Sequence, residues 1–315
     1  MIYQKQAGFP GNVVNKDGEP PIIHGENLFL TRLFGELQEQ MGGAFDKWSF
    51  TLHYRHFSEK EVGDVRFVRD TQRHNALILL ADEHGRFPIG SAQGFDLIFR
   101  QYLSEPSPKT HPFPVGYHEA CGVVTPVPFA RRKTRLFFSG YLNRNRVDLY
   151  KQFRRILWLP RRNLPGRHLR ELARRAVEKF TVERDFSERY PDSIIRFTEW
   201  FAKGMPPSEY AQVLANSRLA ICPTGFISPE TIRHWEALRL GCVIITDPLP
   251  ANVFYKDSPM IVIQDWSQLH ATLEALMKNP DKLRQIHEAT VDWWNNVCCE
   301  KAVAKYMADI LIPVS

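Results

Sequence analysis

The second half of the chain alternates between short apolar runs and stretches with helical spacing. A strand covered on both faces is apolar at successive positions, whereas a surface helix repeats its apolar residues every three or four positions. Strands that alternate with helices in this way predict a parallel sheet covered on both faces, which is a Rossmann-like domain. We expect strands at 135–140, 193–197, 218–222 and 242–246, and helices at 207–217 and 229–240.

The first half follows a similar pattern with weaker signals. The apolar run 76–81 ends in acidic residues and glycine, which is typical of a buried strand that emerges into a loop. Residues 95–103 favour a second strand, and the apolar positions over 26–41 have the spacing of an amphipathic helix. An α/β domain is therefore expected here as well.

A change in composition separates the two halves. The proline-rich stretch 104–128 is followed by the charged run RRKTR at 131–135, which together suit a domain boundary. A chain of 315 residues is also too long for one ordinary core. We predict an N-terminal domain at 1–132 and a C-terminal domain at 133–315 that ends in helices.

Composition narrows the class of protein. Apolar residues make up 43% and charged residues 24% of the chain, as in ordinary soluble globular proteins. No apolar run approaches the length that spans a bilayer, and the first residues lack the apolar core of a signal peptide. The five cysteines have no spacing suited to zinc, so we interpret Cys222 and Cys242 as buried thiols in a reducing compartment. We expect a cytoplasmic protein, or one peripheral at a membrane face, and a soluble fragment of an anchored Golgi-type enzyme stays open.

Positive charge gathers in one stretch of a chain whose net charge is only +6. Residues 151–175 contain nine Lys or Arg and a single acid, Glu171. Such a cluster predicts contact with an anionic surface, such as a phosphate, an acidic glycan or a lipid headgroup, and its alternative is a solvated helical face. For nucleic acid the sequence offers charge without a supporting motif, which is weak.

The stretch CPTGFISPETIRHWEALRLGCVIITDPLP, residues 222–250, joins a glycine turn to a helix. Ser228 is a good N-cap and Pro229 a good first helical residue, so we expect the helix to start where the chain leaves the turn at Thr224 and Gly225. Free backbone N–H groups and the positive end of the helix dipole then form an anion site. A phosphate suits this position.

Three polar side chains of the expected helix extend that site. Glu230 and Arg233 share one face, and Glu236 lies beside Arg233. A carboxylate here can accept two hydrogen bonds from vicinal hydroxyls, as a ribose offers, while Arg233 can pair with phosphate oxygens. The alternative is a solvated helix with an Arg/Glu pair three residues apart.

The segment 210–246 resembles the signature of exostosin-like glycosyltransferases of the GT-B type. The matching features, in order, are a tyrosine and a leucine on a helix, Ser217, Cys222-Pro223, a glycine, a serine, Arg233, Glu236-Ala237 and Gly241-Cys242 before an apolar strand. Family members often carry Arg where this chain has Thr224, so that phosphate contact would be lost or made by Arg233 instead.

A second segment, 135–150, is similar to the first strand, turn and helix of the nucleotide-binding domain in such enzymes. The resemblance implies that Ser139, Gly140, Arg144 and Arg146 face the donor diphosphate. The alternative for the two arginines is simple exposure to solvent.

The resemblance implies a GT-B-type fold, with two Rossmann-like domains that face a central cleft. It implies transfer of a hexosyl or pentosyl group from a nucleotide-sugar donor to a hydroxyl of a glycan, glycolipid or glycoprotein, as in polysaccharide biosynthesis. The C-terminal domain would bind the nucleotide and the N-terminal domain the acceptor, with no metal or other cofactor. The alternative is a non-catalytic module that binds a nucleotide or an acidic glycan.

We expect the transfer to invert the anomeric centre. An inverting reaction needs a base that takes the acceptor proton, and the N-terminal domain should supply it. Asp82 and His84 follow the expected strand 76–81 at the end that faces the cleft, so we predict one of them as this base; the alternative is two turn residues. His118 and Glu119 are second candidates because a short motif of this kind resembles one in related transferases. Trp293, Trp294 and Tyr306 are expected to pack in the terminal helices, the last of which crosses back to the first domain in the GT-B fold.

Overall fold

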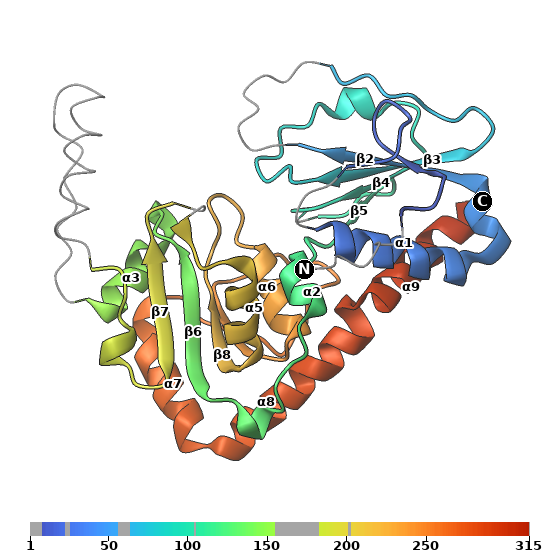
Figure 1. Ribbon diagram of the computed structural model, residues 1–315. Coiled ribbons are helices and arrows are strands. Elements are labelled where there is room, and N and C mark those ends of the chain that lie inside the picture. Colours follow the sequence, from blue (N-terminus) through green and yellow to red (C-terminus); the bar gives the residue numbers. More distant parts are fainter. Residues whose placement is uncertain are drawn as a thin grey trace, which may run out of the picture.

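The computed structural model describes residues 8–22, 26–55, 64–103, 105–154, 183–200 and 203–314. Within these ranges the chain forms two five-stranded parallel sheets, each flanked by helices, and Figure 1 shows them as two bodies joined by the C-terminal helices. The predicted fold class is confirmed: two Rossmann-like domains in the GT-B arrangement.

The N-terminal sheet has its strands in chain order, β1-β2-β3-β4-β5, and every neighbouring pair is parallel. The predicted strand at 76–81 lies in β3, while the strand expected at 95–103 is shorter. The bounds are β1 Val13–Val14, β2 Trp48–Tyr54, β3 His74–Leu80, β4 Leu97–Arg100 and β5 Thr110–Pro112, with helices α1 Asn27–Met41 and α2 Glu119–Val123.

The C-terminal sheet has the order β10-β9-β8-β6-β7, so the chain first adds β7 on one side of β6 and then β8 to β10 on the other. Each predicted strand of this half is present. The strands are β6 Thr134–Tyr141, β7 Ser193–Thr198, β8 Ser217–Cys222, β9 Val243–Thr246 and β10 Ile261–Val262. The helices are α3 Val147–Phe153, α5 Pro207–Ala215, α6 Ile232–Arg239, α7 Leu269–Lys278, α8 Pro280–Trp293 and α9 Glu300–Leu311.

Successive side chains of a strand point to opposite faces, and β6 shows how both faces of this sheet are covered. Phe137 packs in the cluster that contains α5 and α6, whereas Leu136 and Phe138 pack in the cluster that contains α3 and α7. The short apolar runs of the sequence are therefore explained as predicted, because the strands that they form are buried on both faces. Cys222 and Cys242 are buried, as expected.

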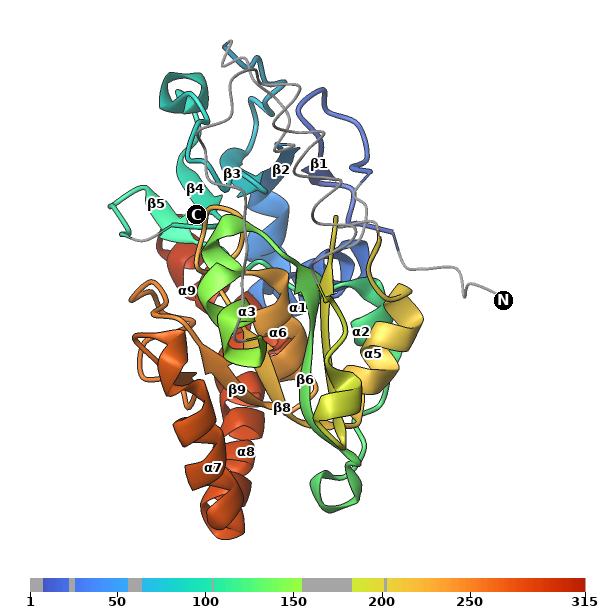
Figure 2. The same ribbon diagram turned by 90° about the vertical axis from the view of Figure 1, so that its left-hand side faces the viewer.

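The terminal helix α9 leaves the C-terminal domain and lies along α1 in both views (Figures 1 and 2). Tyr306 on α9 donates a hydrogen bond to the carbonyl of Pro112 at 3.2 Å, and the ring of Trp294 lies 6.0 Å from that of Tyr117. The expected packing role of these aromatic residues is confirmed. One apolar cluster thus crosses from one domain to the other, through contacts such as Phe29 against Trp235 at 5.9 Å.

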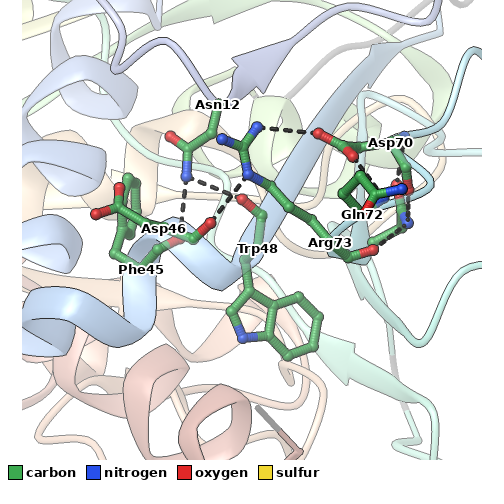
Figure 3. A network of polar contacts seen from close by, with 8 residues as sticks. Asn12, Phe45, Asp46, Trp48, Asp70, Gln72 and Arg73 are labelled. Carbon is green, nitrogen blue, oxygen red and sulfur yellow. Dashed lines mark hydrogen bonds and ion pairs between the residues drawn. The ribbon is translucent and has the colours of Figure 1, made fainter.

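The amino ends of β2 and β3 are closed by a network of polar contacts (Figure 3). Asn12 Nδ2 donates to the carbonyls of Phe45 at 3.1 Å and Trp48 at 2.9 Å. Arg73 Nε donates to the carbonyl of Asp46 at 2.9 Å, and its Nη1 donates to Asp70 at the same distance. This end of the sheet is held by groups that bond one another, so the opposite end is the one left to face a ligand.

Candidate functional site in the cleft between the domains

The carboxyl ends of both sheets open onto one cleft with a volume of about 430 Å³. Its N-terminal wall contains residues at or just after the ends of β2, β3 and β4, and its C-terminal wall contains residues at the ends of β6 and β8. The strand order reverses between β6 and β8, and ligands of such sheets bind at that point. The strand order and the position of the cleft therefore indicate the same binding site.

Two arginines flank the turn after β6. Arg146 Nε donates to the carbonyl of Thr224 at 3.0 Å and its Nη1 to that of Tyr141 at 2.9 Å, while Arg233 Nη2 donates to the carbonyl of Ser139 at 2.9 Å. A Cβ on Gly140 would lie 2.8 Å from Arg233 Nη2 and 3.1 Å from Arg146 Nη1. Only glycine lets both guanidinium groups approach the strand so closely.

Neither guanidinium forms an ion pair with a carboxylate of the described residues. Burial, together with the neighbouring Arg233, lowers the pKa of Arg146 to about 9, which leaves it charged at neutral pH. Backbone carbonyls orient the two side chains, and the Glu236 carboxyl near Arg233 interacts with it electrostatically without forming an ion pair. The pair therefore presents positive charge to an anion that enters the cleft, and phosphate oxygens are its best partners.

Buried carboxyls line the same cleft. Burial raises the pKa of Glu230 to about 8 and that of Glu236 to about 7, the latter against the lowering effect of Arg233. Glu230 is only 2% exposed, and its Oε2 has no hydrogen-bond partner. Arg233 Nε and the Tyr210 hydroxyl, which also belong to the cleft lining, are buried without a well-aligned hydrogen bond, although Tyr210 lies close enough to Arg233 and Glu236 to influence the pKa of each. Buried polar atoms are rarely left unpaired in proteins, so these three atoms indicate a polar ligand.

The N-terminal wall adds a third carboxyl of this kind. Burial raises the pKa of Glu26 to about 7, and the negative charge of Glu236 adds to the effect. Gln101 Nε2 donates to Glu26 at 3.4 Å and to the carbonyl of Pro114 at 3.0 Å, which holds the amide in place. Glu26 had no visible role in the sequence because it stands ahead of an ordinary amphipathic helix.

The glycine turn differs from its prediction. Helix α6 begins at Ile232, three positions later than expected, because Thr231 is its N-cap and forms a capping box with His234. The hydroxyl of Ser228 instead accepts from the backbone N–H of Glu230 at 3.2 Å. Burial lowers the pKa of His234 to about 3, so its ring is neutral and can serve as the cap partner.

The N–H groups of the turn already have partners. Thr224 directs its backbone N–H and its hydroxyl to Asp247, at 2.7 and 2.8 Å. The N–H groups of Ile227 and Ser228 donate to Glu83 Oε1 at 2.9 and 2.8 Å. The expected anion site is thus present as a pair of convergent N–H groups, and a carboxylate of the other domain occupies it.

The structure brings most of the predicted donor-site residues together. Arg144 is exposed and does not line the cleft, while Thr224 and Ser228 form the turn behind it. The predicted residues that line the cleft are Ser139, Gly140, Arg146, Gly225, Glu230, Arg233 and Glu236.

The two residues predicted as the base do not reach the cleft. Asp82 is 3% exposed and accepts hydrogen bonds from the backbone N–H groups of Arg86 and Phe87 and from Arg100 Nη2, at 2.7 to 3.0 Å. His84 is exposed on the surface, outside the cleft lining. Of the second candidates, His118 lines the cleft and Glu119 does not.

Three further predictions can be compared with the structure only over the described residues. Most of the basic stretch 151–175 lies outside them, and its first residue, Lys151, pairs with Asp148 at 2.6 Å. In the described ranges no helix is both long and apolar enough to cross a bilayer. In the same ranges no three His, Cys, Asp or Glu side chains gather to hold a metal ion.

Comparisons with known proteins give distant structural likenesses. No family model matches the chain, and no curated protein matches its sequence. A sucrose-phosphate synthase from Thermosynechococcus elongatus is similar at 10% identity and a TM-score of 0.49, over 96% of this chain and 98% of that one. A UDP-forming α,α-trehalose-phosphate synthase from Burkholderia xenovorans has 12% identity and a TM-score of 0.48, over 93% and 80%. MurG from Acinetobacter baumannii has 11% identity and a TM-score of 0.37, over 76% and 67%. These likenesses are too distant to bear on activity, and the fold class rests on the topology of the chain itself.

Proposed function

We propose that the protein is a glycosyltransferase that moves a sugar from a nucleotide-sugar donor to a hydroxyl of a glycan, glycolipid or glycoprotein. The observation that carries this proposal is the composition of the cleft. Two guanidinium groups that form no ion pair with the described residues lie in one cleft with buried carboxyls, one of which, Glu230, has an unpaired oxygen, at the switch point of a parallel sheet. A nucleotide-sugar offers phosphates to the first and vicinal hydroxyls to the second.

Each residue then has a role in binding or in charge stabilisation. Arg146 and Arg233 face the diphosphate and neutralise the charge that develops on the leaving group, and such electrostatic stabilisation contributes more than any other effect in many enzyme reactions. Glu230 and Glu236 bind hydroxyls of the ribose or the sugar. Because the two arginines supply positive charge, we propose a transfer that needs no metal ion. The resemblance of 210–246 to exostosin-like enzymes supports the same assignment.

The acceptor proton needs a base on the N-terminal wall if the reaction inverts the anomeric centre. Asp82 is fully engaged in its own loop and His84 points to solvent, whereas Glu26 lines the cleft. A carboxyl with a pKa near the working pH is well suited to general base catalysis. We therefore place the base at Glu26.

Nucleotide binding tests the proposal directly. Thermal unfolding of the purified protein is measured with UDP, GDP, CMP and their sugars, with and without EDTA. We expect one nucleotide class to raise the Tm regardless of EDTA, and Glu236→Gln to lose the shift, because a ligand that binds only the folded state stabilises it. No shift with any nucleotide at millimolar concentration would overturn the donor assignment. Binding without release of a nucleoside diphosphate in the presence of glycan acceptors would favour the non-catalytic module.

A further inference from the structure

A single carboxylate joins the two walls of the cleft. Glu83 follows β3 of the N-terminal sheet, and its Oε1 accepts hydrogen bonds from the backbone N–H groups of Ile227 and Ser228 in the C-terminal domain. Both distances, 2.9 and 2.8 Å, are those of charge-assisted hydrogen bonds. The turn that the sequence predicts as an anion site therefore holds an anion, which comes from the protein itself.

The surrounding chain fixes Glu83 in this position. Ala81 has a positive φ of 59°, which turns the backbone sharply at the end of β3. Asp82 then anchors the loop through Arg86, Phe87 and Arg100, so the next side chain is directed across the cleft. On the other side, a Cβ at Gly225 would lie 3.1 Å from Glu83 Oε1 and 2.9 Å from the Ser228 carbonyl. Glycine at 225 keeps the approach open.

The occupied N–H pair contrasts with the rest of the donor site. Neither Arg146 nor Arg233 forms an ion pair with a carboxylate of the described residues, and Glu230 Oε2 is buried without a hydrogen bond. The N–H pair is therefore satisfied within the protein, whereas Glu230 Oε2 is not. A carboxylate oxygen and a phosphate oxygen present the same acceptor to two converging N–H groups, so each can replace the other.

We propose that Glu83 is an internal substitute for a donor phosphate: it occupies the N–H pair of Ile227 and Ser228 in the empty enzyme, and a phosphate of the donor binds there by displacing it. This inference rests on the proposed function, since it concerns the same donor site. The exchange breaks the two hydrogen bonds across the cleft, so the domains are joined through Glu83 before the donor binds and through the donor afterwards. The freed carboxylate then faces solvent.

Competition of this kind lowers the apparent affinity for every phosphate ligand. The measured Kd equals the intrinsic value divided by the fraction of molecules in which the N–H pair is free. Removal of the Glu83 carboxylate sets that fraction to one. A residue that merely helped to build the donor site would have the opposite effect, because its loss would weaken binding.

The test is calorimetric titration of inorganic pyrophosphate into wild type, Glu83→Ala and Glu83→Gln at pH 8. We expect Glu83→Ala to lower the Kd by about tenfold, the worth of one net charge-assisted hydrogen bond. Glu83→Gln should give a smaller decrease, because its amide oxygen still accepts from the two N–H groups. Equal or weaker binding by Glu83→Ala than by wild type would overturn the proposal.

The matched control is Glu26→Gln, which removes a carboxylate from the same cleft and leaves the turn untouched. Its Kd for pyrophosphate should change far less than that of Glu83→Ala. Equal tightening in both variants would mean that only the overall charge of the cleft matters, and would also overturn the proposal. A single cooperative unfolding transition in the absence of ligand, well above the temperature of the titration, shows that each variant is folded.

A second readout separates this inference from the donor assignment. In wild type the backbone amide resonances of Ile227 and Ser228 should shift on addition of pyrophosphate, and in Glu83→Ala they should already be displaced before it. If no variant binds any nucleotide, the proposed function itself fails. If wild type and Glu83→Ala bind the preferred nucleotide equally well, the donor site stands and only the role of Glu83 is lost.

Discussion

The two ends of the N-terminal sheet differ in whether their polar groups have partners. The hollow at the amino end has a volume of about 900 Å³, larger than the 430 Å³ of the cleft at the carboxyl end. Within the described ranges, none of the buried polar atoms without a partner belongs to the amino-end lining, whereas three belong to the cleft. They are the Tyr210 hydroxyl, Glu230 Oε2 and Arg233 Nε.

The comparison teaches that size alone is a poor guide to a site. At the amino end Arg73 donates a hydrogen bond to Asp70, and Asn12 donates to two backbone carbonyls. A ligand there would have to compete with these hydrogen bonds. In the cleft a ligand would satisfy atoms that burial has already stripped of water. An unpaired buried polar group destabilises the folded protein by about 1–3 kcal/mol, and a ligand that forms a hydrogen bond with it removes this penalty.

The largest expected effect concerns the base. Glu26→Gln should lower kcat/KM by about 10²–10⁴, the usual contribution of a general base, and leave the nucleotide-induced Tm shift in place. Because burial raises the pKa of Glu26 to about 7, wild-type activity should rise with pH through that value as the carboxyl loses its proton. The variant should lose the part of this rise that belongs to Glu26, while any part that comes from Glu236, whose pKa burial also raises to about 7, should remain. Initial rates from pH 5.5 to 8.5 measure both.

Asp70→Asn is the matched change at the amino end, since it also converts a carboxyl to an amide. It removes the negative charge that faces Arg73 and should leave kcat/KM close to wild type. If Asp70→Asn lowered the rate as much as Glu26→Gln, the contrast between the two ends would be wrong.

A somewhat smaller loss is expected for the cleft arginine. Arg233→Ala should reduce kcat/KM by about 10²–10³, as for the removal of one group that stabilises developing charge. Arg233→Lys should recover part of the activity, because it restores the charge and lacks the planar guanidinium. Steady-state kinetics with a saturating acceptor would separate the effects on kcat and KM.

Arg73→Ala tests the other end with the same substitution. It breaks the exposed hydrogen bonds to Asp46 and Asp70 and should destabilise the fold by at most about 1 kcal/mol without a change in kcat/KM. An inactive but folded Arg73→Ala variant would contradict the assignment of this end to structure.

Local pattern was sufficient for the fold and for half of the site. Strands and helices repeat in the sequence with their own periods. Arg146, Arg233 and Glu236 follow strands of one predicted sheet, so the rule that ligands bind beyond the carboxyl ends of the strands brings them together although they are far apart in the chain. Glu26 and Glu83 come from the opposite wall, and no local pattern connects them to the residues that they face in the other domain. Such partners emerge only when two domains are placed face to face.

The direction of single side chains was the second feature that the sequence could not reveal. Asp82, Glu83 and His84 are consecutive and polar, and only the left-handed turn at Ala81 decides that the middle one enters the cleft. The start of α6 depended on a similar detail. His234 is an uncommon partner for a capping box, which usually has Glu or Gln at that position, so the sequence favoured Ser228 over Thr231 as the N-cap.

The smallest expected effect is on stability, and it uses the unpaired carboxyl of the cleft. Burial raises the pKa of Glu230 from 4.5 to about 8, so the folded protein binds a proton that the unfolded chain releases between these values. The stabilisation is complete below about pH 4.5 and is lost as the pH rises through about 8. Glu230→Gln has no proton to lose, so between pH 6 and pH 8.5 its free energy of unfolding should fall by about 2 kcal/mol less than that of wild type. Urea unfolding at the two pH values measures the difference, with Arg73→Ala as a control that should stay parallel to wild type because it removes no carboxyl. An equal change in the free energy of unfolding for Glu230→Gln and wild type would mean that the pKa of Glu230 is not raised, because neighbouring groups stabilise its charge. At this position the cleft would then resemble the amino end of the sheet, where polar groups have partners.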